Sequence, residues 1–366
     1  MKVGILGGGQ LGQMLAEAAT PLDVETTVLD PAKDAVAQQV TRHLAADWTD
    51  SEALAELART DVVTYEFENV PAEAVEKLIA DVPVHPAPEA LVKSGDRIVE
   101  KNLFRELGIE TAPFAQVDTR ADLDCAVTEI GLPAILKTRR FGYDGKGQVV
   151  LRSDADVETA LDVIGGQPAI LEGFVPFDRE VSVLAVRDRD GALEYWPATE
   201  NVHVDGILHI SRAPAPEVPH ALLAEAVRGL EAIMARLDYV GVLVVEFFQV
   251  GERLVANEMA CRVHNSGHWT IEGAPTSQFE NHVRAVAGLP LGKTDVAGFS
   301  AMINLVGEIP SLASLEGRDD VFLHVYGKSP RAGRKLGHVT VVADTREALE
   351  AKIDEVLAVV GDRARD

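Results

Sequence analysis

The sequence is poor in cysteine, in positive charge and in long apolar runs. Its two cysteines, Cys125 and Cys261, lie far apart, show no metal-ligand spacing and fit a reducing cytoplasm, with a single disulfide left open. Lys and Arg number 34 against 58 Asp and Glu, and the formal net charge of −24 repels nucleic acid and anionic membranes. No run approaches the ~20 apolar residues of a membrane span, and the apolar start Lys2–Leu6 is too short for a signal peptide. We therefore expect a cytoplasmic protein that has no nucleic-acid or membrane partner.

What the chain does have is a globular composition and two local groups of cations. Hydrophobic residues make up 47% of the 366 residues, enough for two or three domains. In so acidic a chain, anionic ligands must be captured by local basic clusters. One cluster spans Arg139 to Lys146, and the second comprises Lys328, Arg331, Arg334 and Lys335. Solvated charged faces would give the same pattern.

The order of apolar runs and helical patterns predicts three domains. Residues 1–95 alternate strands and helices in the βαβ rhythm of a Rossmann-like parallel sheet. Residues 96–290 form a second domain, with a subdomain at about 112–175 and a strand-rich, antiparallel subdomain at about 176–290. Residues 291–366 form a small α+β domain that a helix at 346–360 closes. The fold class is therefore mixed α/β and α+β.

A glycine-rich turn, Gly7 to Gly12, directly follows the first predicted strand and opens a helix. It satisfies G-x-G-x-x-G, and Asp30 ends the second strand where a ribose-binding acid would lie. The pattern is typical of dinucleotide binding. The same backbone could hold a lone phosphate at the helix N-terminus, or it could be an ordinary tight turn.

A second glycine-rich segment follows Lys137, the last residue of an apolar strand. Glycines let the backbone approach a ligand, and Arg139, Arg140 and Lys146 add positive charge, which suits a polyphosphate. A strand resumes at Gln148, so this is a hairpin loop, and the P-loop spacing is missing. An ordinary hairpin tip would also fit.

Two glutamates, Glu246 and Glu258, lie equally far from the hairpin tip at Glu252 and should be cross-strand neighbours. Strict alternation gives each an apolar face: Val242, Val244 and Phe248 with Glu246, and Leu254, Ala256 and Ala260 with Glu258. Two opposed carboxylates on such faces repel and lose solvation. Bound Mg²⁺ removes both penalties. A twisted tip that sends both acids to solvent is the alternative.

Two further segments carry polar groups at strand ends. Arg262-Val-His-Asn-Ser-Gly-His-Trp269 follows the second glutamate strand and suits an oxyanion substrate beside a transferred phosphoryl group. Ile170–Val175, with Glu180 beyond it, could bind adenine through exposed backbone and ribose through the acid. Taken alone, the latter is a common strand end.

Strand lysine, glycine-rich hairpin loop, hinge strand and paired glutamates, in this order, resemble the ATP-grasp superfamily. Three segments, 141–148, 262–269 and 331–338, together with the opening Gly-Gly-Gly-Gln-Leu-Gly-Gln-Met-Leu, resemble the N5-carboxyaminoimidazole ribonucleotide synthetase family over essentially the whole chain. The resemblance implies a Rossmann-like preATP-grasp domain, an ATP-grasp domain and a small C-terminal domain. It also implies a homodimer.

The implied reaction is the ATP-dependent carboxylation of 5-aminoimidazole ribonucleotide with bicarbonate, through carboxyphosphate, in purine biosynthesis. ATP is a substrate and Mg²⁺ the cofactor. By the family pattern, the nucleotide would contact Arg97, Lys137, Gly142, Tyr143, Asp144, Gly145, Lys146, Gly147, Gln148, Glu172, Gly173, Phe174, Val175, Glu180, His203, Asn257 and Glu258. Glu246 and Glu258 would bind Mg²⁺.

The catalytic and substrate residues follow from the same resemblance. Arg262, His264 and Asn265, with Lys137, would act on bicarbonate and carboxyphosphate. The ribonucleotide would contact Gly9, Gln10, Leu11, Glu66, Lys328, Arg331, Arg334 and Lys335.

Two residues depart from the family pattern. Ala260 replaces an asparagine that many ATP-grasp enzymes carry two residues after the second metal glutamate, so water or a neighbour must complete the metal shell. Cys261 replaces a usual proline next to Arg262. The alternatives are a formate-using glycinamide ribonucleotide transformylase, a nicotinamide-dependent dehydrogenase that uses the first glycine-rich turn, and a non-catalytic nucleotide sensor.

Overall fold

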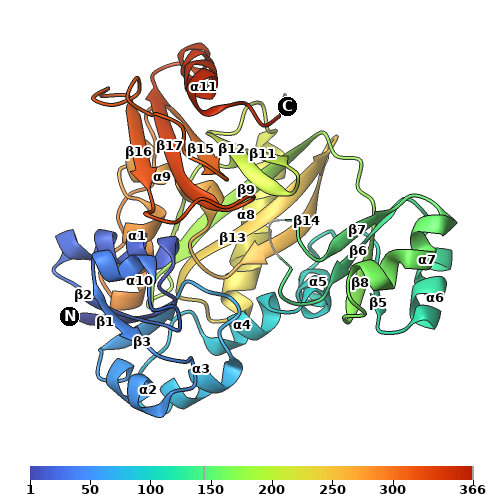
Figure 1. The fold of residues 1–366 in the computed structure, drawn as a ribbon, viewed down its shortest axis with the longest axis horizontal. Helices are drawn as coiled ribbons and strands as arrows, with labels where there is room; N and C mark the ends of the chain where they lie inside the picture. Colours follow the sequence, from blue (N-terminus) through green and yellow to red (C-terminus); the bar gives the residue numbers. More distant parts are fainter. Residues whose placement is uncertain (143–144, 365–366) are drawn as a thin grey trace.

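The structure is a computed structural model that describes residues 1–142 and 145–364. Its strands form three sheets, which Figure 1 shows side by side: an N-terminal sheet, a small sheet set apart, and a large sheet between the N-terminal sheet and the C-terminal helix. Among the described residues, none of the helices is both long enough and apolar enough for a membrane crossing.

The N-terminal sheet is parallel, with strand order β3-β2-β1-β4. Its elements are β1 (Lys2–Leu6), α1 (Gln10–Ala19), β2 (Glu25–Asp30), β3 (Arg42–Ala45), α2 (Ser51–Leu57), β4 (Val62–Tyr65) and α3 (Ala72–Leu78), with short 3-10 turns at Thr20–Leu22 and Val36–Gln39. The predicted parallel sheet is confirmed. β3 was not predicted, because this edge strand has only two apolar residues among its four.

The small sheet is antiparallel, with order β5-β8-β6-β7. Two helices, α4 (Pro88–Ser94) and α5 (Arg97–Glu106), lead to it. It comprises β5 (Phe114–Val117), α6 (Arg120–Ile130), β6 (Ala134–Thr138), β7 (Gln148–Leu151), α7 (Asp154–Val163) and β8 (Ala169–Gly173). Lys137 pairs with Gln148 across β6 and β7, so the predicted hairpin is confirmed.

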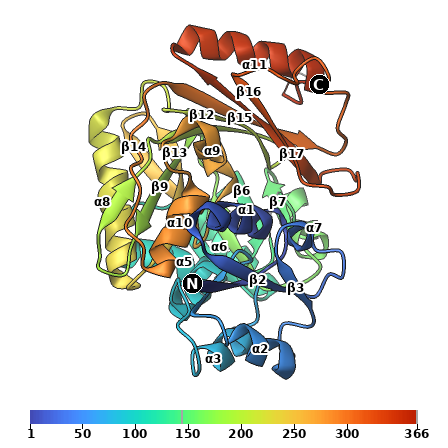
Figure 2. The same ribbon diagram turned by 90° about the vertical axis from the view of Figure 1, so that its left-hand side faces the viewer.

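The large sheet has nine strands in the described part of the chain, in the order β14-β13-β9-β11-β12-β15-β17-β16, with β10 beside β9. Its strands are β9 (Arg179–Arg187), β10 (Leu193–Tyr195), β11 (Thr199–Val204), β12 (Ile207–Ala213), β13 (Gly241–Val250), β14 (Arg253–Ala260), β15 (Phe299–Val306), β16 (Val321–Val325) and β17 (Lys335–Ala343). Its helices are α8 (His220–Arg236), α9 (Thr270–Gly273), α10 (Gln278–Ala287) and α11 (Arg346–Val360). Figure 2 shows α11 along the C-terminal strands.

The C-terminal strands continue this sheet, because β15 pairs with β12 through Ile210 and Ile303. One hydrogen-bonded frame therefore runs from the paired glutamates of β13 and β14 to Lys335 at the start of β17. The expected domain boundary at residue 291 falls before β15, and the bounds of all three domains stay predictions.

A buried histidine of α10 joins the N-terminal sheet to the large sheet. His282 Nδ1 accepts the Val242 N–H of β13 at 3.1 Å, and its Nε2 lies 2.8 Å from Thr64 Oγ1 of β4. This pairing makes Nε2 the protonated nitrogen of a neutral ring. Burial lowers the pKa of His282 to about 3.

This histidine predicts a loss of stability in mild acid. Its folded pKa lies below the unfolded value of 6.5, so its stabilisation is complete above pH 6.5 and is lost as pH falls towards 3, by about 1.4 kcal/mol per pH unit. His282→Asn keeps an acceptor for Val242 N–H but cannot titrate. We expect its unfolding free energy in urea to fall about 2 kcal/mol less than that of the wild type between pH 6.5 and 5. The exposed His220→Asn is the control, and equal pH dependence in His282→Asn and the wild type would refute the assignment.

Candidate active site

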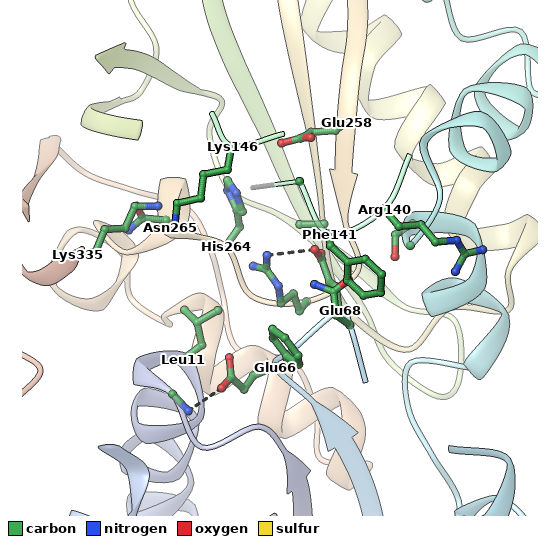
Figure 3. Close-up of a pocket in the computed structure, with 18 of the residues that line it drawn as sticks. Leu11, Glu66, Glu68, Arg140, Phe141, Lys146, Glu258, His264, Asn265 and Lys335 are labelled. Carbon is green, nitrogen blue, oxygen red and sulfur yellow. Dashed lines mark hydrogen bonds and ion pairs between the residues drawn. The ribbon is translucent and has the colours of Figure 1, made fainter. Parts of the chain in front are cut away.

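A cavity of about 750 Å³ lies where the N-terminal turn, α5, the glycine-rich loop and the large sheet meet. In Figure 3, Leu11 and Glu66 stand at one end of it, Glu258 at the other, and His264 between them. The cavity collects most of the predicted site residues from distant parts of the chain. Those on its wall are Gly9, Gln10, Leu11, Glu66, Arg97, Gly142, Lys146, Glu246, Glu258, Arg262, His264, Asn265, Lys328, Arg331, Arg334 and Lys335.

The other predicted nucleotide residues do not line this cavity. Lys137, Gly145, Gly147, Gln148, Glu172, Gly173, Phe174, Val175, Glu180, His203 and Asn257 are described residues outside its wall, and Tyr143 and Asp144 fall outside the described residues. Some of these residues still influence the charge of a residue on the cavity wall. His203 Nδ1 lies 2.8 Å from Glu180 Oε2, and both influence the pKa of Glu246.

The first glycine-rich turn is built around two of the protein's own carboxylates. Gly8 N donates to Asp30 Oδ2 and Gly9 N donates to Glu66 Oε1, both at 2.8 Å. At Gly7, whose φ is +115°, a Cβ would lie 2.6 Å from the Glu66 side chain. The glycines thus make room for Glu66 and Asp30. Two amides that a dinucleotide would need are already engaged, which disfavours the dehydrogenase alternative.

The paired glutamates are direct cross-strand neighbours, as predicted, with Glu246 opposite Glu258. The predicted faces are wrong in part. A β-bulge at Asn257 shifts the register, so Ala256 pairs with Phe247 and lies on the opposite face from Glu258. Leu254 moves to that opposite face with Ala256, whereas Ala260 stays on the face of the glutamates.

The negative charges of the two carboxylates are offset to different degrees by neighbouring groups. Arg97 Nη1 lies 2.7 Å from Glu258 Oε2. Burial opposes ionisation of Glu258, but Arg97, Lys137 and Lys101 together lower its pKa. Burial and the neighbouring Glu258 raise the pKa of Glu246, although His203 opposes them. Glu246 Oε1 and Asn257 Oδ1 are buried and accept no hydrogen bond from any described residue. Oxygen atoms of this kind fit a hard divalent cation.

Lys137 is held by a buried carboxylate that it shares with another lysine. Glu172 Oε1 lies 3.3 Å from Lys137 Nζ, and Glu172 Oε2 lies 3.3 Å from Lys101 Nζ. Burial opposes ionisation of Glu172, but Lys101, Lys137 and Arg97 together lower its pKa to about 2. Burial lowers the pKa of Lys137. The Glu172 side chain is therefore an ion-pair partner within the protein.

The segment after β14 places a guanidinium and an imidazole at the centre of the cavity. Arg262 Nη2 lies 3.3 Å from Glu68 Oε2 and forms an ion pair with it. His264 Nδ1 accepts the N–H of Ser266, so its Nε2 carries the hydrogen in the neutral ring. Burial, followed by the charges of Arg262 and Lys335, holds the pKa of His264 well below its usual value. Asn265 exchanges hydrogen bonds with Asn304 of β15.

Glu68, Glu100 and Lys101 were not among the predicted site residues. Glu100 and Lys101 are buried on α5 beside Leu103 and Phe104. Charged residues at the buried positions of an amphipathic helix were the available signal, because such charges need buried partners. Burial and Glu258 raise the pKa of Glu100 to about 8.

Three family models cover the chain. They are described as a ribonucleotide synthetase preATP-grasp domain over residues 1–94, an ATP-grasp domain over 102–279 and a phosphoribosylaminoimidazole carboxylase C-terminal domain over 300–352. They confirm the expected three-domain ATP-grasp architecture.

Relatives agree over nearly the full length. The N5-carboxyaminoimidazole ribonucleotide synthase of Pseudomonas aeruginosa is 54% identical over 361 residues, which are 98% of this chain and 99% of the relative. The crystal structure of the Thermus thermophilus synthetase is 50% identical, with a TM-score of 0.94 over 98% of this chain and 99% of the other. The Aspergillus clavatus synthase, crystallised with ADP and 5-aminoimidazole ribonucleotide, is 32% identical, with a TM-score of 0.89 over 98% of both chains. The chain therefore belongs to the N5-carboxyaminoimidazole ribonucleotide synthase family of ATP-grasp ligases.

Proposed function

We propose that this ligase carries out its family's ATP-dependent carboxylation of 5-aminoimidazole ribonucleotide with bicarbonate, through carboxyphosphate and with Mg²⁺. The observation that carries the proposal is the shared cavity. It places the Glu246–Glu258 pair, Arg262 and His264, and the Lys328–Lys335 cluster around one space. The residues proposed to bind the cation, the bicarbonate and the phosphate of the ribonucleotide therefore line the same cavity.

The nucleotide phosphates would lie between Arg97, Lys137 and the glycine-rich loop. Arg97 Nη2 donates to Gly142 O at 3.3 Å, which ties the start of the loop to α5. Gly145 and Gly147 have φ values of +73° and +71°, conformations that favour glycine. We infer that the adenine and ribose lie towards β8, Glu180 and His203, as the family pattern implies.

Glu246, Glu258 and Asn257 would hold Mg²⁺. Glu246 Oε1 and Asn257 Oδ1, which accept no hydrogen bond from the described part of the chain, fit this role, and water would replace the ligand that Ala260 does not supply. When bound, the cation supplies charge that offsets the phosphates during phosphoryl transfer. Arg97 keeps Glu258 ionised, as a metal ligand must be.

The chemistry proceeds in two balanced steps. A bicarbonate oxygen attacks the γ-phosphorus and ADP leaves, which forms carboxyphosphate. The exocyclic amine of the ribonucleotide then attacks the carboxyl carbon, inorganic phosphate leaves, and the amine gives up a proton. Arg262 stabilises the bicarbonate charge, and neutral His264 donates its Nε2 hydrogen to a carboxyl oxygen. Closure of the glycine-rich loop would keep water from the unstable intermediate.

The phosphate of 5-aminoimidazole ribonucleotide would bind the basic cluster at the C-terminal side of the cavity. This cluster comprises Lys328, Arg331, Arg334 and Lys335. Lys328 contacts Gln10 of α1, which joins the cluster to the N-terminal turn at Gly9 and Leu11. The Aspergillus clavatus relative was crystallised in complex with ADP and this ribonucleotide, which supports binding of both ligands by this chain.

We further propose that the enzyme is a cytoplasmic homodimer. Cys125 and Cys261 are both free thiols, which fits a reducing compartment. The homodimer rests on the family resemblance, and sedimentation equilibrium tests it directly.

The decisive experiment measures ATP hydrolysis by the purified protein. We expect hydrolysis to require Mg²⁺, bicarbonate and 5-aminoimidazole ribonucleotide together, with one N5-carboxyaminoimidazole ribonucleotide formed per ADP. Formate replaces bicarbonate in the control reaction and should not support turnover. A rate of ATP hydrolysis that does not depend on bicarbonate would overturn the proposal.

Glu258→Gln should abolish Mg²⁺-dependent turnover while the protein stays folded. The amide keeps the size of the side chain but removes the charge that would bind Mg²⁺ and pair with Arg97. We expect kcat to fall about 100-fold or more. Glu252→Gln, at the exposed hairpin tip, is the matched control. Near-wild-type activity of Glu258→Gln would remove this residue from the metal site.

Lys335→Ala should weaken binding of the ribonucleotide and leave binding of ATP unchanged. Loss of a charge-assisted contact to phosphate costs about 1.5–3 kcal/mol, which predicts a rise of about 10- to 100-fold in the ribonucleotide KM. Steady-state kinetics with each substrate varied in turn measure both constants. An increase confined to the ATP KM would place Lys335 at the nucleotide instead.

A further inference from the structure

Three polar side chains on one face of α5, Arg97, Glu100 and Lys101, reach the strand that carries Glu258. Arg97 contacts Glu258 itself. Glu100 Oε1 accepts the N–H of Met259 at 2.7 Å. Lys101 Nζ donates to Asn257 O at 2.6 Å and to Ala256 O at 3.1 Å. The i, i+3, i+4 spacing lets one helix hold four consecutive residues of β14.

These contacts satisfy backbone groups that the sheet leaves open. β14 is an edge strand, and the bulge at Asn257 breaks its ladder with β13. Backbone groups that face away from β13 need other partners when buried. Glu100 and Lys101 provide three of these partners, and the carbonyl oxygen of Glu110, beyond α5, accepts the Ala256 N–H at 2.7 Å. The exposed fractions of Glu100 and Lys101 are only 2% and 1%. The backbone around the bulge is therefore held mainly by α5.

Lys101 also links this strand to the lysine proposed to bind phosphate. Glu172 pairs with both Lys101 and Lys137 at 3.3 Å. Lys137 can therefore turn towards a nucleotide phosphate without leaving a buried carboxylate uncompensated, because Lys101 remains beside Glu172. An isolated buried charge would oppose that movement strongly.

Buried ion pairs are seldom the most stable way to fill a core, since apolar residues of similar volume often do as well. Stability alone therefore does not account for a buried acidic side chain and a buried lysine at this place. We propose that Glu100 and Lys101 are positioning residues, which hold the Asn257 bulge so that Asn257 and Glu258 present their oxygens to the nucleotide-bound cation. The inference rests on the proposed function for the identity of that cation.

Lys101→Met tests the proposal, because it keeps most of the side-chain volume and removes the ammonium. We expect the dissociation constant of Mg-ADP, measured by calorimetry, to rise about tenfold or more. That of 5-aminoimidazole ribonucleotide should change by less than about twofold. In the ligand-free protein, the amides of Asn257 and Met259 should exchange with deuterium faster than in the wild type.

Arg105→Met is the matched control, since it removes one positive charge from the exposed face of the same helix. It should leave Mg-ADP affinity and β14 exchange unchanged. Wild-type Mg-ADP affinity in Lys101→Met would overturn the proposal. The proposal would also be overturned if Lys101→Met bound both Mg-ADP and the ribonucleotide more weakly and its amides exchanged faster throughout the large sheet. That result would indicate a general loss of stability.

Two substitutions at Glu100 keep the proposal testable if Lys101→Met does not fold. Glu100→Gln retains an acceptor for Met259 N–H and should bind Mg-ADP within about threefold of wild type. Glu100→Leu removes the acceptor, and its affinity for Mg-ADP should fall about tenfold below that of the wild type. Equal affinities of these two variants would refute the inference. These measurements need no turnover, so a wild-type enzyme that binds Mg-ADP but does not carboxylate the ribonucleotide contradicts the proposed function alone.

Discussion

The site depends on two carboxylates that stand opposite each other in a buried cavity. Glu246 and Glu258 repel, and burial removes the water that would screen them. Arg97 compensates Glu258 directly. Glu246 Oε1 accepts no hydrogen bond from any described residue, and the His264 ring 3.8 Å away is neutral. A divalent cation relieves this imbalance, so the local electrostatics favour metal binding before any nucleotide is considered.

The large sheet explains how distant residues act together. β14 carries Glu258 at one edge, and β17 begins at Lys335 near the other edge. Asn265 and Asn304 exchange hydrogen bonds between the segment after β14 and β15. The proposed metal, bicarbonate and phosphate sites are therefore parts of one hydrogen-bonded frame. This frame is more rigid than a contact between separate domains would be.

Sequence reasoning succeeded where geometry is local. The pairing of Lys137 with Gln148 follows from a short hairpin. The opposition of Glu246 and Glu258 was predicted from a hairpin centred on Glu252, but the turn joins Val250 to Arg253, and the bulge at Asn257 brings Glu258 opposite Glu246. Sequence reasoning failed where a partner lies far along the chain. The contact between Lys101 and Asn257 spans 156 residues, and the bulge that it accompanies interrupts the alternation on which the face assignment relied. No local pattern records such a partner.

The glycine-rich turn shows how one local pattern can serve another purpose. Its amides point at an anion, as in a dinucleotide site, but the anions are Glu66 and Asp30 of the protein itself. The turn is therefore closed without a ligand, and it offers the substrate little positive potential. A phosphate in this acidic chain must then be held by side-chain cations. This constraint explains why the Lys328–Lys335 cluster lies against the turn, with Lys328 in contact with Gln10.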